Sequence, residues 1–161
     1  MNGPPSPNGN PFEYSIGRQR EFAHTSLYNN LHKIPGIENV HWSESNSGIA
    51  QEIRADVTVD VFAEGVIPCS EAHLTVNWWP QESGEQDWFQ LHYWDDTGFD
   101  CGWHRHTNDH VDGLTHYQER AGADAEYDYR SITFDHGNPV GILWDVVDDR
   151  LIDVLIKRYS E

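Results

Sequence analysis

Apolar and polar residues alternate along much of the middle of the chain. From 53 to 61 every second residue is Ile, Ala or Val, and the residues between them are Arg, Asp or Thr. A period of two is typical of a strand that buries one face, so the pattern predicts a strand over 53–62. Similar segments predict strands at 73–79, 88–94, 99–106, 115–119 and 127–134, and a short one at 37–42. A turn at 95–98 joins two of these into a hairpin.

Two segments near the ends of the chain follow helical spacing instead. The first is expected to start with Ser15 as N-cap, to end before Pro35, and to pack through Phe22, Ala23, Leu27, Tyr28 and Leu31. The second is expected to start with Asn138 as N-cap and Pro139 at the first helical position. The sequence therefore predicts an α+β fold, in which an antiparallel sheet of about six strands carries an N-terminal and a C-terminal helix packed on one face.

The chain length of 161 residues fits a single domain. Residues 1–12 are rich in Pro, Gly and Asn and are expected to form a disordered tail, which leaves 13–161 as one α+β domain. No apolar run approaches the roughly 20 residues of a membrane span, and no secretory signal pattern is visible. We therefore expect a soluble, cytoplasmic protein with no membrane partner. Cys69 and Cys101 do not form a disulfide framework.

The composition is strongly acidic, with 27 Asp and Glu against 10 Lys and Arg, and a formal net charge of −17. Only two of the basic residues are lysines, Lys33 and Lys157. An acidic, lysine-poor surface is typical of an acidic halophilic protein, because high salt screens the repulsion between carboxylates. The charge argues against a nucleic-acid binder that relies on a broad basic patch, although a small local cluster of basic residues remains compatible with it.

Residues that can carry chemistry concentrate in one segment, 102–118. Four histidines, His104, His106, His110 and His116, lie there with Arg105 between the first two. Imidazole titrates near neutrality, so two histidines can serve as base and acid, and a guanidinium can stabilise charge on a phosphate. The segment predicts a metal-independent ribonuclease site with His104, His106, His116 and Arg105 as catalytic candidates. Because side chains alternate along a strand, His104 and His106 share a face and Arg105 is expected on the opposite one.

The same histidines permit two other interpretations. His-x-His on one strand face, with a further ligand from a neighbouring strand, suits a divalent metal such as zinc, with His104, His106, His110 and His116 as candidate ligands. The spacing from Gly98 to His104 is also similar to the first motif of the cupin barrels, although their second motif is not visible. Alternatively, the histidines only pack between strands, and the protein is a non-catalytic protein-interaction module of a halophile.

The chain also resembles the TumE family of toxin–antitoxin proteins over about residues 73–158. The shared features are a strand with a Tyr, a turn, a strand leading into a His- and Asn-Asp-rich stretch, an aromatic strand and a C-terminal helix. In this chain they fall at 91–94, 95–98, 103–106, 108–110, 116–118 and from 139 onward. Haloarchaeal members show a similar Trp-His and His-x-Gln arrangement. This chain departs from the family in its N-terminal extension and in having His104-Arg-His106 where many members have an Arg-x-Asp-Asn stretch.

The resemblance implies a toxin that cleaves RNA as an endoribonuclease and is neutralised by a helix-turn-helix antitoxin protein. On that interpretation Asn108, Asp109, Tyr117 and Gln118 are candidates for contacts with the phosphates or bases of the RNA substrate. No cofactor is required by this mechanism, and assembly into a homo-oligomer is left open.

Overall fold

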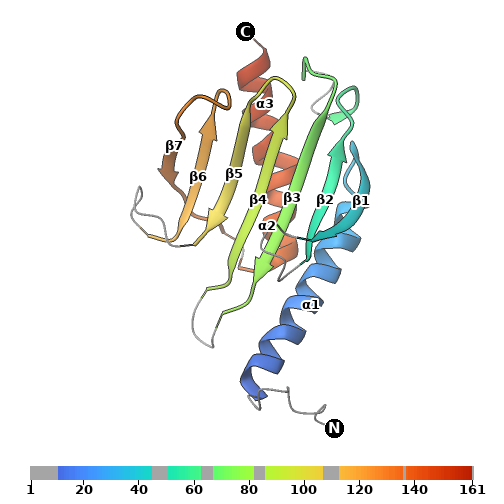
Figure 1. Ribbon diagram of the computed structural model, residues 1–161, viewed down its shortest axis with the longest axis vertical. Helices are drawn as coiled ribbons and strands as arrows, with labels where there is room; N and C mark the ends of the chain where they lie inside the picture. Colours follow the sequence, from blue (N-terminus) through green and yellow to red (C-terminus); the bar gives the residue numbers. More distant parts are fainter. Residues whose placement is uncertain are drawn as a thin grey trace.

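The computed structural model describes residues 11–44, 51–62, 67–81, 86–106, 113–135 and 137–160. An N-terminal helix, α1 (Pro11–Leu31), precedes a run of strands, and the chain ends in α2 (Pro139–Asp145), the π-helical η2 (Val146–Arg150) and α3 (Leu151–Tyr159) (Figure 1). The strands are β1 (Ile37–Glu44), β2 (Gln51–Val57), β3 (Ala72–Trp79), β4 (Trp88–Asp95), β5 (Asp100–Arg105), β6 (Thr115–Arg120) and β7 (Asp128–Ser131). The predicted α+β fold is confirmed, with seven strands where about six were expected.

The strands form one antiparallel meander in the order β1 to β7, so each strand pairs with its neighbours in sequence. This single linear order differs from the barrel that the cupin-like spacing would require. The register places buried apolar residues opposite one another across five strands, in the row Ile53, Val76, Leu91, Trp103 and Tyr117. Because side chains alternate along each strand, this row defines one face of the sheet, and the residues between them define the other.

The strand predicted over 53–62 ends earlier, at Val57. The amide of Thr58 still donates to the carbonyl of Gly36 at 2.7 Å, and the amides of Val61 and Phe62 then donate to the carbonyl of Thr58 at 3.0 and 2.8 Å, which forms a turn. Gly36 has a φ of 83°, and a Cβ there would lie 2.9 Å from that of Phe62. Phe62 therefore packs in the core beside a turn that favours glycine, and the alternation of apolar residues after Val57 does not continue the strand.

Both helices contribute to the core on the same face of the sheet. Leu27 and Leu31 of α1, and Leu143 and Leu151 of the C-terminal segment, are buried in one cluster with the apolar strand row. Figure 1 shows α3 running behind the central strands. The expected packed side of α1 is corrected at Phe22, which is 77% exposed: the buried positions recur every four residues, and Phe22 lies outside that stripe.

The two ends of the C-terminal helical segment are fixed by polar side chains. The Asn138 side chain accepts from the amide of Gly141 at 2.7 Å, and Pro139 occupies the first turn, which confirms the predicted N-cap. At the other end the hydroxyl of Tyr159 donates to Asp95 at 2.7 Å, in the turn between β4 and β5. This contact attaches the last helix to the predicted hairpin.

The predicted disordered tail lies largely outside the described residues, although Pro11 and Phe12 belong to α1. A proline suits the first helical position, because its fixed φ matches the helix and its missing N–H would have no partner there. Across the part of the chain that the structure describes, the helices are too short or too polar to cross a membrane. The two cysteines are free thiols.

Candidate metal centre on the open face of the sheet

The two faces of the sheet differ completely in what covers them. The helices pack on the apolar face, and Figure 1 shows none of them in front of the other face. Polar side chains occupy most of the alternate strand positions near the middle of this face, and Trp79, Trp88 and Trp94 also lie on it. One row crosses four strands with Gln90, His104, His116 and Ser131, and a second row contains His92, Gly102, Gln118 and Tyr129.

Three predicted site histidines meet on this face. His104 of β5 and His116 of β6 are direct cross-strand partners, and His106 follows β5 on the same side. The ring centroids lie 5.4 Å apart for His104–His116, 5.0 Å for His106–His116 and 5.3 Å for His104–His106. One nitrogen from each ring lies within 4.8 Å of the others, so the triad converges on a common point.

The triad is buried beneath one half-exposed ring. His104 is 6% exposed and His116 is fully buried, whereas His106 is only half-buried. Burial, together with the neighbouring His92, His106 and His116, lowers the pKa of His104 to about 2. Burial and His106 also lower the pKa of His116. Both imidazoles are therefore neutral near pH 7, the form in which a ring nitrogen offers a lone pair to a metal.

A chain of hydrogen-bonding groups extends from His104 to the edge of the cluster. His104 Nε2 lies 3.2 Å from His92 Nδ1, and His92 Nε2 lies 3.1 Å from Asp100 Oδ1. The guanidinium of Arg120 donates to the second carboxylate oxygen of Asp100. Although burial raises the pKa of Asp100, hydrogen bonds from His92, Tyr127 and Arg120 lower it to about 2 overall. A fully ionised carboxylate thus terminates the chain.

Gly102 leaves the space in which the hydrogen bonds between His104, His92 and Asp100 form. It lies in β5 between the strand positions of His92 and Gln118. A Cβ at this position would lie 2.4 Å from His92 Nδ1 and 2.5 Å from His104 Nε2, closer than any real Cβ contact. Any larger residue would therefore push the two imidazoles apart.

The other predicted site residues divide between the two faces. Arg105 lies on the helix side, as the alternation predicted, where it donates to Thr115 Oγ1 at 3.0 Å and stacks over the Phe89 ring at 5.0 Å. Tyr117 is also on that side, buried against Trp103. Gln118 lies on the open face and bonds to His116. The predicted contacts at Asn108 and Asp109 and the candidate ligand His110 lie outside the described residues.

His92, Asp100 and Arg120 adjoin the triad on the open face, although the sequence pattern alone does not single them out. The sequence does contain a hint of this grouping. Residues 92, 100, 102 and 104 are all even-numbered positions in two strands joined by a predicted four-residue turn. In a hairpin of known register, residues of matching parity lie on one face. The register itself, which pairs His92 with Gly102, depends on the turn geometry and was not fixed by the alternation.

The donor set fits a divalent transition metal. His104 Nδ1 and His106 Nε2 lie 3.3 Å apart. Two nitrogens bound to one tetrahedral zinc lie roughly that far apart, given Zn–N bonds of about 2.0–2.1 Å. Three histidines are also a usual ligand set for catalytic zinc, which keeps a further position for water. The partly exposed ring of His106 gives the side from which an ion and a water could enter.

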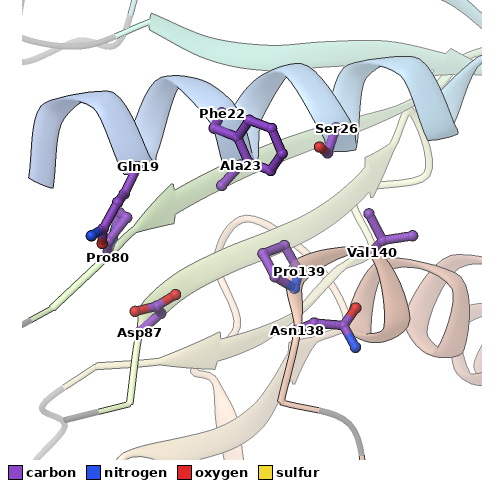
Figure 2. A pocket seen from close by; sticks show the side chains of 9 residues that line it. All are labelled: Gln19, Phe22, Ala23, Ser26, Pro80, Asp87, Asn138, Pro139 and Val140. Atoms are coloured by element: carbon purple, nitrogen blue, oxygen red, sulfur yellow. The ribbon is translucent and has the colours of Figure 1, made fainter. Parts of the chain in front are cut away.

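Two hollows lined by described residues lie outside the triad. On the helix side, a groove of about 320 Å³ runs between α1 and the start of α2 (Figure 2). Its walls are mostly apolar, and its one carboxylate, Asp87, accepts hydrogen bonds from Trp78 and Gln81. On the open face, a hollow of about 310 Å³ borders the outer end of the histidine chain and is lined by His92, Trp94, Asp95, Gly98, Asp100, Arg120, Ala123 and Tyr127.

No protein-family model, no curated protein and no solved structure matches this chain.

Proposed function

We propose that this protein binds one divalent transition metal ion, zinc being the best fit, through His104, His106 and His116. The observation that carries the proposal is the convergence of three ring nitrogens within 4.8 Å on the open face. The three converging ligand atoms are ring nitrogens, and such a nitrogen set suits zinc better than magnesium or calcium.

A metal held by three neutral imidazoles supplies Lewis-acid chemistry, including the activation of a bound water for hydrolysis. The protein residues would hold the ion, exclude solvent on the sheet side and leave access past His106. The burial of His104 and His116 suits ligands that stay neutral and immobile.

The experiment is a zinc titration of the purified protein, followed by calorimetry, with His106→Ala as the test variant. His106 is half-buried, so its truncation leaves the core intact. We expect equimolar zinc binding by the wild type and a loss of affinity of about 100-fold or more in the variant, since one of three ligands is removed. His73→Ala is the matched control, because His73 is a half-buried histidine on the same face that pairs with Asp56. No binding by the wild type, or equal losses in both variants, would overturn the proposal.

The endoribonuclease toxin implied by the resemblance remains a second proposal, and its mechanism can be separated from the first. Acid–base catalysis without metal needs a histidine that exchanges a proton near neutrality. The pKa of about 2 at His104 leaves that role to a less buried ring, and Arg105 lies on the opposite face. Incubation with RNA in high salt with EDTA tests this: cleavage that persists with EDTA and is lost in His106→Ala, the variant of the less buried ring, supports the metal-independent toxin, and equal RNA decay in both proteins refutes it.

A further inference from the structure

We propose that Asp100, acting through His92, fixes the proton of His104 on Nε2 and so directs the Nδ1 lone pair of His104 at the three-histidine centre. The functional consequence rests on the proposed metal site. His92, Asp100 and Arg120 are then positioning residues, which act on the metal through His104 without touching it.

Arg120 and Asp100, at the outer end of the series of hydrogen bonds, determine which group donates in each of them. The Arg120 guanidinium can only donate, and it occupies one oxygen of Asp100. The other carboxylate oxygen can only accept, so His92 must carry its proton on Nε2, the nitrogen 3.1 Å away. A neutral His92 then has a bare Nδ1.

The same constraint determines which nitrogen of His104 carries the proton. In the neutral form of His92 the bare Nδ1 is an acceptor, and it lies 3.2 Å from His104 Nε2, so His104 donates from that nitrogen. A neutral His104 therefore has a bare Nδ1, the atom that lies 3.3 Å from His106 Nε2 inside the triad. Ligating histidines commonly donate their other N–H to an outer partner, which sets the tautomer and orients the ring.

Gly102 and Tyr127 support this arrangement from two sides. The absence of a side chain at Gly102 allows His92 and His104 to approach each other above β5. Tyr127 forms a further hydrogen bond to Asp100, so three donors hold this carboxylate. Asp100 is only 6% exposed, which limits the access of water as a competing donor.

The test is Asp100→Asn, which keeps the shape of the side chain and replaces one acceptor with an amide donor. Because Arg120 requires an acceptor, the amide oxygen should face Arg120 and the NH₂ should face His92. His92 and His104 would then both shift their protons to Nδ1, which blocks the ligand atom of His104. We expect zinc affinity to fall about 10–100-fold, and ¹⁵N NMR of the metal-free protein to show His104 protonated on Nδ1 in place of Nε2.

Asp56→Asn is the matched control, because Asp56 bonds His73 on the same face at 2.9 Å without reaching the triad. His92→Phe gives a second test if Asp100→Asn fails to fold: it keeps a ring but leaves His104 Nε2 without an acceptor, and the same loss of affinity is expected.

The two proposals fail in distinguishable ways. If the wild type binds no zinc, the metal site is wrong, and the NMR comparison of the metal-free proteins still decides the tautomer. If the wild type binds zinc while Asp100→Asn and His92→Phe keep its affinity and the Nε2 proton of His104, the positioning role is overturned and the metal site stands.

Discussion

Two pairs of histidine and aspartate on the open face look alike but have different surroundings. His73 bonds Asp56 at 2.9 Å near β1, and His92 bonds Asp100 at 3.1 Å near β6. The Asp56 side chain is 43% exposed and the Asp100 side chain is 9% exposed. The first pair extends to Asn39, which donates to Asp56, and to the exposed Glu71 beside His73, whereas His92 continues to His104 and the triad. The pair alone therefore does not make a site: the additional rings on the adjoining strands do.

The same contrast holds between the two faces of one strand. Leu91 and His92 are neighbours in β4, yet Leu91 is buried among Val76 and Trp103 and His92 faces the triad. Apolar burial on one face supplies stability, and the other face is left for polar chemistry. Single substitutions on either face should separate the stability that the apolar face supplies from the zinc affinity of the open face.

Leu91→Ala should lower the free energy of unfolding by about 2–5 kcal/mol, because it removes a buried side chain and leaves a cavity. Zinc affinity at native temperature should not change, since Leu91 points away from the histidines. Denaturant unfolding and zinc titration of the same sample measure both quantities. A parallel loss of zinc affinity would show that the two faces are not independent.

Acidification should destabilise the protein through His24, a buried histidine on the helix side. Burial, with a smaller effect of Arg20, lowers the pKa of His24 from 6.5 to about 4, and its Nε2 accepts from the amide of Trp78 at 3.0 Å. The unfolded chain therefore takes up a proton between pH 6.5 and 4 that the folded chain does not. The contribution of His24 is complete above pH 6.5 and is lost as the pH falls toward 4, by about 2–3 kcal/mol.

The comparison that isolates this effect is His24→Gln, whose carbonyl oxygen can still accept from Trp78. Unfolding of both proteins at pH 7 and pH 4.5 should show a smaller fall in the variant. An equal fall in the free energy of unfolding in both proteins would mean that His24 does not cause the acid destabilisation.

Gly102→Ala should cost about 1–3 kcal/mol of stability, because the rings that the new methyl meets must shift. Zinc affinity should also fall about 10–100-fold, since His92 and His104 can no longer stay in contact. Gly122→Ala is the control, because a Cβ there meets nothing within 4 Å. Unchanged zinc affinity in Gly102→Ala would show that metal binding does not depend on the close approach of His92 and His104.

Sequence alternation predicted most of the fold because local periodicity is a direct record of which face is buried. It also placed His104 and His106 on one face with Arg105 opposite, as observed. It could not pair His104 with His116 or His92 with Asp100, because register depends on how each connection turns. The π-helical segment at Val146–Arg150 likewise has no signature in the apolar spacing, which is the same for a continuous α-helix.

The most direct test of the metal centre is X-ray absorption at the zinc edge of the zinc-loaded protein. We expect three imidazole nitrogens at about 2.0–2.1 Å, with any remaining ligand an oxygen at a similar distance. His106→Ala should remove one imidazole from the spectrum. A sulfur ligand at about 2.3 Å would place the ion at a cysteine, and a shell of oxygens without imidazole would place it on the acidic surface; either result would contradict a three-histidine centre.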